Sequence, residues 1–142
     1  PLIKNFPLPP HLSHHDSNKI DLSLNHENQD GIITNQQKSV SGYGSFESPQ
    51  KHEMDQIQKC LSHGHFQYDF PKYLSFGKIN DDLIFSKKGT KTLIEALLKN
   101  PSVSKIFLEP HLRNRMNLTN SKIRYHGCHA VRHDDHIHLE LK

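Results

Sequence analysis

The last stretch of the chain, residues 136–142, alternates polar and apolar side chains without interruption. Such alternation is typical of a strand that packs one face on a core, because successive side chains of a strand point to opposite sides. We therefore expect His136, His138 and Glu140 to share one face, with the aliphatic residues between them buried. Two imidazoles on the same side of a rigid strand can face one cleft, where one can bind a metal ion and the other can act as a base.

The remaining segments mix helix and strand patterns without the regular rhythm of βαβ units, which favours an α+β fold. Thr92, with Glu95 following in the same helical turn, fits a capping box, and Asn100 and Pro101 end that helix. The expected elements are strands over 20–24, 32–33 and 103–110, helices over 50–62 and 92–100, and a helical turn over 112–116.

The chain of 142 residues predicts a single domain over 1–142, with a long polar loop at about 25–50. No apolar run approaches the about 18 residues of a membrane-spanning helix, so we expect no transmembrane segment. The net charge is +3 and the charged residues are interspersed along the chain, so a nucleic-acid partner is not expected.

Five aromatic residues are expected in the core: Phe66, Tyr68, Phe70, Tyr73 and Phe76.

Histidine is the outlier of the composition, with 13 residues, many of them in two clusters at 11–21 and 133–138. Histidine is the commonest metal ligand in proteins. A turn between His14 and Asp21 would bring the two side chains together, and one histidine of the last strand would add a second nitrogen. Two nitrogens and one carboxylate oxygen, with water in the fourth position, form a catalytic zinc arrangement.

The residues of these clusters match a known family. The stretches SHHDSNKID (13–21) and HDDHIH (133–138) resemble the penicillin-insensitive murein endopeptidases. These enzymes belong to the LAS metallopeptidases, a group named for lysostaphin, D-Ala-D-Ala peptidases and sonic hedgehog. The group shares a histidine, an aspartate seven residues later, and a carboxyl-terminal His-x-His. In this chain His14 and Asp21 have that spacing, and His136 and His138 form the His-x-His pair.

The resemblance implies a zinc-dependent peptidase that hydrolyses amide bonds in peptidoglycan cross-links, with one Zn²⁺ per chain. It assigns the metal to His14, Asp21 and His138, with zinc-bound water as the nucleophile. It gives His136 the role of general base, or of orienting the water, and His133 the stabilisation of the tetrahedral intermediate.

The resemblance also implies a small antiparallel sheet with flanking helices and a periplasmic or cell-envelope location. Only ten residues precede His11, so a chain shortened at its amino terminus is expected. His11 has a counterpart near the metal in the murein endopeptidases. Apart from the resemblance, the Asp135 carboxylate is a candidate for orienting a ligand imidazole from outside the metal's own ligands.

Two alternatives stay open. The first is a non-catalytic zinc-binding module of the same fold, as in the hedgehog branch of the group. It is favoured by Ser17, where the family usually has glycine, and by Lys19, where it often has aspartate. The second is a histidine-rich protein that binds several metal ions weakly. The oligomeric state is not predicted.

Cys60 and Cys128 allow one disulfide or two buried thiols, and the sequence does not choose between them. Asp134 is expected in a loop. Four of the histidines outside the two clusters are expected in solvated loops or in the wall of a cleft: His63, His65, His126 and His129.

Overall fold

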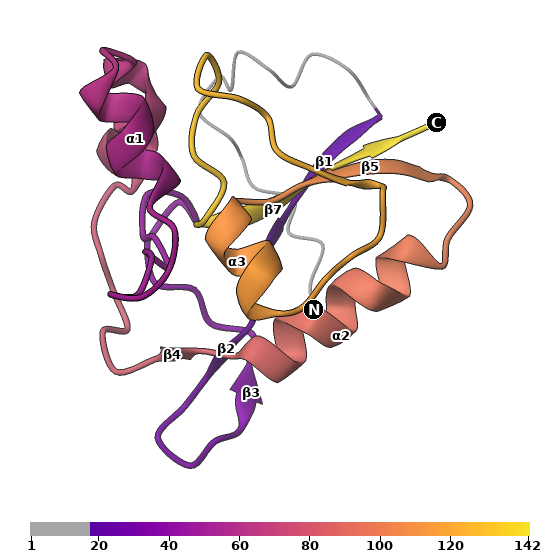
Figure 1. Ribbon diagram of the computed structural model, residues 1–142. Helices are drawn as coiled ribbons and strands as arrows, with labels where there is room; N and C mark the ends of the chain where they lie inside the picture. The colour runs from indigo at the N-terminus through magenta and orange to yellow at the C-terminus, as the bar shows by residue number, and fades with distance from the viewer. Residues whose placement is uncertain (1–17) are drawn as a thin grey trace.

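The main sheet has four strands in the spatial order β1-β7-β5-β6, in a computed structural model that describes residues 18–142. The first and last strands in sequence, β1 and β7, are neighbours in this sheet (Figure 1). His11 and residues 13–17 of the first motif, which include His14 and Ser17, lie outside the described residues. The strands are β1 (Lys19–Ser23), β5 (Val103–Phe107), β6 (Ile123–Arg124) and β7 (His136–Leu141).

The α+β fold class is confirmed, but the sheet is not purely antiparallel. Strand β7 pairs antiparallel with both β1 and β5, whereas β5 and β6 run parallel. The reason is the connection between these two strands: after β5 the chain passes through helix α3 (Pro110–Arg115) before it enters β6. A crossover of this kind returns the chain in the same direction, whereas a tight hairpin would reverse it.

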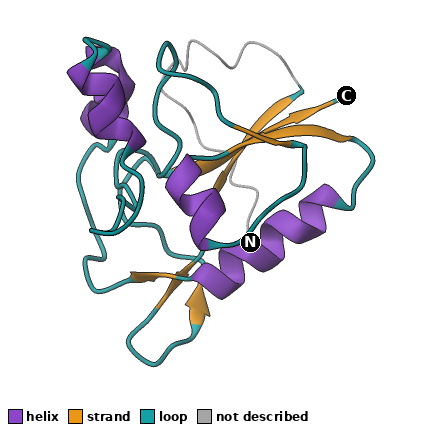
Figure 2. Ribbon diagram, viewed as in Figure 1, coloured by secondary structure: helices purple, strands orange, loops and turns teal. Residues whose placement is uncertain are grey.

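The alternation predicted for the last strand is confirmed. Ile137 and Leu139 of β7 are buried in the main hydrophobic core, which also takes in Ile94 of helix α2 (Lys87–Leu98) and Leu112 of α3. Figure 2 shows both helices against the strands of the main sheet. His136 and His138 are also buried, on the opposite face of β7. Both faces of this strand are therefore covered.

Helix α2 begins earlier than its sequence pattern predicts. The hydroxyl of Ser86 accepts a hydrogen bond from the Gly89 amide at 3.0 Å and caps the helix. Thr90 is buried and its hydroxyl accepts a hydrogen bond from the Asn25 amide. Thr92 therefore lies inside the helix, and the expected capping box at Thr92 was wrong.

The polar segment at 25–50 contains part of a second, three-stranded sheet, in the order β3-β2-β4. The strands are β2 (His26–Glu27), β3 (Ile33–Thr34) and β4 (Ile84–Phe85), and β2 pairs antiparallel with both others. The strand expected at 32–33 is therefore present, displaced by one residue. The rest of the segment, up to residue 50, contains no further named strand or helix.

A second cluster of buried residues joins helix α1 (Gln56–Ser62) to the 3-10 helix η1 (Phe66–Leu74). Cys60 of α1 forms a disulfide with Cys128, from the loop after β6. This bond connects α1 to the loop that leads toward β7. No helix within residues 18–142 has the length and apolar character that crossing a membrane requires.

The expectation that five aromatic residues lie in the core was wrong for four of them. Tyr68 is buried, but Phe66, Phe70, Tyr73 and Phe76 are 68%, 51%, 69% and 62% exposed. Residues three apart share one side of a 3-10 helix. Phe70 and Tyr73 therefore point the same way, with their rings 6.0 Å apart, while the Tyr68 side chain turns inward.

Candidate metal centre

Asp21 and His138 lie directly opposite each other in the antiparallel pair β1–β7. Their side chains share one face of the sheet, and Oδ1 of Asp21 is 2.9 Å from Nδ1 of His138. Both residues are buried. The strand register thus brings together two of the three expected zinc ligands, which are separated by 117 positions in the sequence. The third, His14, lies outside the described residues.

His136 and His133 complete the group on the same face. Nε2 of His136 is 3.6 Å from Oδ1 of Asp21. The His133 ring, from the loop before β7, is centred 5.3 Å from that of His136 and 5.7 Å from that of His138. One nitrogen from each of the three imidazoles lies within 4.8 Å of the others. This buried three-histidine group, His133, His136 and His138, can hold a metal ion.

Asp135 orients the ring of His136. Its Oδ1 is 2.7 Å from Nδ1 of His136, and its Oδ2 accepts a hydrogen bond from the Gly44 amide at 2.8 Å. A carboxylate that engages one imidazole nitrogen fixes which nitrogen faces the other way. Nε2 of His136 is therefore the atom that faces Asp21. Asp135 occupies the position, beside a candidate ligand, that the sequence analysis expected.

Tyr43 is a site residue that the sequence analysis missed. Its hydroxyl donates to Oδ2 of Asp21 at 2.5 Å, and its ring meets the ring of His136 edge-on, with centroids 5.0 Å apart. Burial and the negative charge of Asp21 raise the pKa of Tyr43, so it remains a donor. No local pattern marks this tyrosine, because it lies in the polar segment between two glycines.

Glu109 fastens the loop that carries His133. Oε1 of Glu109 accepts a hydrogen bond from the His133 amide at 2.7 Å, and the Glu109 amide donates to the His133 carbonyl at 3.0 Å. The other carboxylate oxygen accepts from the Tyr68 hydroxyl at 2.6 Å. Burial raises the pKa of Glu109 to about 7, against the lowering effect of the Tyr68 hydrogen bond. No sequence pattern predicted a role for Glu109.

Asp134 belongs to a separate polar network that supports the same loop. Arg132 donates to both of its carboxylate oxygens, at 2.7 Å from Nε and 2.6 Å from Nη2. Nε2 of His111 is 3.5 Å from Oδ2 of Asp134, and the guanidinium of Arg132 lies 3.7 Å from the centroid of the Phe46 ring. The neighbouring carboxylates of Asp134 and Asp135 thus serve different partners.

His126 lies at the edge of the group, although the sequence analysis expected only a loop or a cleft wall there. Its ring stacks on Phe107 with centroids 4.2 Å apart, and it is 5.3 Å from the ring of His133. Burial and the nearby His138 lower the pKa of His126. Strand β6 lies beside β5, so His126, two residues after the end of β6, reaches the site from the side.

Burial of the site lowers the pKa of its histidines, whereas the neighbouring carboxylates raise it. Burial by itself lowers the pKa of His136, but the charges of Asp135 and Asp21 and the hydrogen bond from Asp135 outweigh it and raise the pKa to about 9. Burial, followed by the charges of His136 and His138, holds the pKa of His133 well below its usual value. The carboxylates therefore favour the charged form of the His136 imidazole, whereas burial favours the neutral form of the His133 imidazole.

The donor set fits zinc. Imidazole nitrogens and carboxylate oxygens are ordinary zinc ligands, and a catalytic zinc site uses three such protein ligands. Buried carboxylates beside buried imidazoles also supply the negative charge that a divalent cation requires.

Comparisons with known proteins give no match: no protein-family model, no curated protein and no solved structure is similar enough to this chain to be recognised.

Proposed function

We propose that this protein is a zinc-dependent peptidase that hydrolyses amide bonds in peptidoglycan cross-links. The observation that carries the proposal is the contact of Asp21 and His138 at 2.9 Å, with His136 and His133 on the same face of the sheet. A carboxylate and several imidazoles that converge in a buried position suit a catalytic metal. The choice of peptidoglycan as substrate rests on the family resemblance.

We assign the zinc ion to His14, Asp21 and His138. Oδ1 of Asp21 and Nδ1 of His138 are 2.9 Å apart, which is close enough for both atoms to bind the same ion. His14 is included because the family motif has a metal ligand at this position. The three-histidine group is a rival donor set, since it shares His138 but uses His133 and His136 as ligands. The two sets predict different losses of metal on mutation, so they can be separated.

The ion would supply a Lewis acid that polarises the scissile carbonyl and lowers the pKa of a water to about 7. The protein contributes the rest. His136 is held through Nδ1 by Asp135; its Nε2 would orient the attacking water, and it would accept the proton of that water when the imidazole is in its neutral form. His133 has a depressed pKa and is neutral, so it can donate a hydrogen bond to the oxygen that gains negative charge. Tyr43 holds Asp21 in place through the second carboxylate oxygen.

The decisive experiment combines metal analysis with digestion of purified muropeptides. We expect one zinc per chain and a cleaved cross-link from the wild-type protein. Asp21→Ala and His14→Ala should lose both zinc and activity, whereas His136→Ala should keep zinc and lose turnover. His52→Ala, which changes an exposed histidine, is the matched control and should change neither.

Two outcomes would revise the proposal. If His136→Ala and His133→Ala release the metal while His14→Ala retains it, the three-histidine group holds the ion. If wild-type protein carries one zinc per chain but yields no product from any muropeptide, the peptidase function fails.

A non-catalytic zinc module is the second candidate, and one observation favours it. Lys19, at a position where the family often has aspartate, lies on β1 opposite Glu140 of β7. It is two residues from Asp21, so the two side chains leave the same face of the strand. A cation in this place adds positive charge next to the metal site. Zinc retention without turnover, in the experiment above, would select this function.

A further inference from the structure

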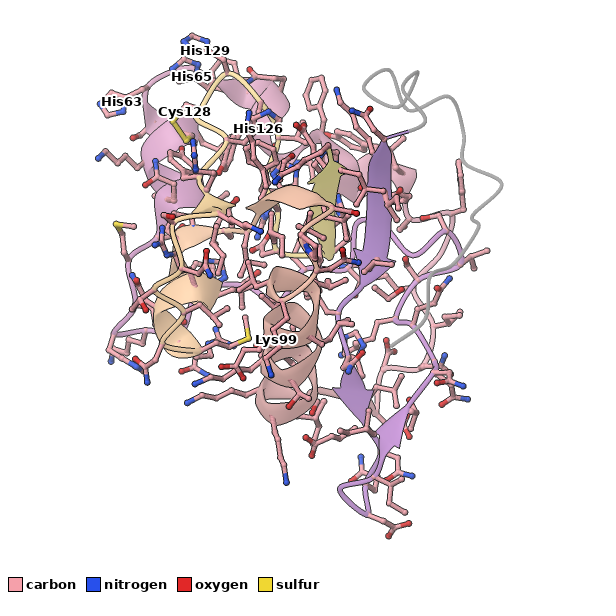
Figure 3. The ribbon with its side chains drawn as sticks, turned by 90° about the vertical axis from the view of Figure 1, so that its right-hand side faces the viewer. His63, His65, Lys99, His126, Cys128 and His129 are labelled. Atoms are coloured by element: carbon pink, nitrogen blue, oxygen red, sulfur yellow. A yellow bond between two sulfur atoms is a disulfide. The ribbon has the colours of Figure 1, made fainter. Side chains whose placement is uncertain are left out.

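A second pair of facing imidazoles lies outside the three-histidine group. The rings of His65 and His129 are centred 4.8 Å apart and meet edge to face, with 86° between their planes. Figure 3 shows both residues at one end of the molecule, close to Cys128. His65 comes directly before η1, and His129 belongs to the loop after β6. The two residues therefore come from segments far apart in the sequence.

Covalent and hydrogen bonds hold these two segments against each other. The disulfide between Cys60 and Cys128 places its second cysteine directly before His129. On the other side, the His65 amide donates to the Cys60 carbonyl at 3.1 Å. The disulfide thus anchors the backbone next to both imidazoles.

Gln67 adds a third connection. Its side-chain amide donates to the Cys128 carbonyl at 2.7 Å and to the Ala130 carbonyl at 3.1 Å. These carbonyls belong to the residues on either side of His129. The backbone that carries His129 is therefore fixed relative to η1, and the two imidazoles are held close together in advance of any ligand, so that a rotation of one ring directs a nitrogen of each at a common ion.

We propose that His65 and His129 form a second metal site, which binds one divalent transition metal ion and prefers Cu²⁺. Two imidazoles bound to one ion at about 2.0–2.1 Å have their ring centres roughly 5 Å apart, close to the separation found here. Imidazole suits copper, nickel and zinc, and among these ions Cu²⁺ binds a given nitrogen site most tightly. His129 is exposed and His65 is half-buried, so water can fill the remaining coordination positions.

The preorganisation makes a testable difference to affinity. When one imidazole has bound the ion, the second binds intramolecularly, at a high effective concentration set by the fixed loops. Loss of either imidazole should then weaken binding by about 100-fold. Loss of the disulfide should weaken it by less, because Gln67 still ties the loop to η1.

The test is a titration of the full chain with Cu²⁺, followed by calorimetry and by electron paramagnetic resonance of the bound ion. His65→Ala and His129→Ala should each remove one copper equivalent and its two-nitrogen signal. His63→Ala is the matched control, because it changes an exposed histidine two residues from His65; it should bind copper as the wild type does. His138→Ala should keep the His65–His129 equivalent, which separates this site from the three-histidine group.

A Cys60→Ser/Cys128→Ser variant, checked for folding by circular dichroism, tests the role of the disulfide and should bind copper more weakly at this site. The proposal is overturned if His65→Ala and His129→Ala both retain the copper stoichiometry and spectrum of the wild type. A doubly substituted cysteine variant that folds and binds copper with unchanged affinity would overturn the part assigned to the disulfide.

Discussion

The backbone amide of Gly44 donates to Oδ2 of Asp135 at 2.8 Å, and the other oxygen of that carboxylate contacts His136 at 2.7 Å. A glycine in the polar segment thus supports an imidazole of the candidate metal centre through a single carboxylate. Gly44 has a φ of +79°, and a Cβ at this position would lie 2.4 Å from the Pro71 carbonyl oxygen. Only glycine brings its amide this close without displacing η1.

We therefore expect Gly44→Ala to disturb both stability and the site. The left-handed backbone and the collision with Pro71 together should lower the free energy of unfolding by about 2–4 kcal/mol, measured by denaturant titration. Gly31→Ala is the matched control, since Gly31 also has a positive φ, of +76°, but has open space around its Cβ position. It should cost about 1–2 kcal/mol. Equal losses in the two variants would show that the Pro71 contact is unimportant.

Asp135→Asn should separate orientation from metal binding. The amide keeps the size of the carboxylate but removes the charge that fixes the His136 ring, so the proposed peptidase turnover should fall by about 10–100-fold while zinc is retained. Steady-state cleavage of muropeptides and metal analysis of the same samples measure the two effects. A variant with wild-type turnover would show that Asp135 does not position His136 for the reaction.

The disulfide should contribute strongly to stability. Cys60 and Cys128 are separated by 68 residues, and closing a loop of this length in the unfolded chain is worth about 4 kcal/mol in the chain-entropy model. We expect Cys60→Ser/Cys128→Ser to lose roughly that amount in urea unfolding. Reduced wild-type protein is the control and should unfold at the midpoint of the double variant. A midpoint equal to that of the oxidised wild type would contradict the prediction.

Acid should weaken the ion pair between Arg115 and Glu53. Arg115 donates to both Glu53 oxygens, at 2.9 Å from Nε and 2.7 Å from Nη2. These hydrogen bonds lower the pKa of Glu53 from 4.5 to about 2. Because the folded-state pKa is the lower one, the stabilisation is present above the unfolded pKa of about 4.5 and is lost as the pH falls toward 2.

Glu53→Gln should therefore lose about 1 kcal/mol at neutral pH and show a smaller decline in stability between pH 5 and roughly 2. Thermal unfolding across this pH range measures the difference. Glu95→Gln, on the exposed side of α2, is the control and should follow the wild-type curve. If Glu53→Gln follows it as well, the pair does not contribute.

The candidate site could be predicted from the sequence where side chains lie on one strand. His136 and His138 share a face because alternate residues of any strand do, and Asp21 lies on the polar side of β1 for the same reason. The partners that hold these residues could not be predicted in the same way. Tyr43 and Glu109 come from a polar segment and from a strand–helix junction, where no periodic pattern exists to mark them.

The exposed aromatic residues of η1 also show which features a local pattern predicts and which depend on tertiary contacts. Their spacing suggested a core, because burial of large apolar residues is the common outcome. Which way they point depends on the 3-10 geometry of η1 and on Tyr68 reaching Glu109, and neither is encoded in the spacing alone.

By itself, the sequence determined the alternation of the last strand, the presence of strands near 20–24 and 103–110, and the presence of helices near 50–62 and 92–100, since these follow from local backbone geometry and side-chain type. Only the tertiary structure decided that Asp21 lies opposite His138, that β6 runs parallel to β5, and that Cys60 bonds to Cys128. These are pairings between distant segments. They depend on strand register and on the path of the connections, which local side-chain patterns do not specify.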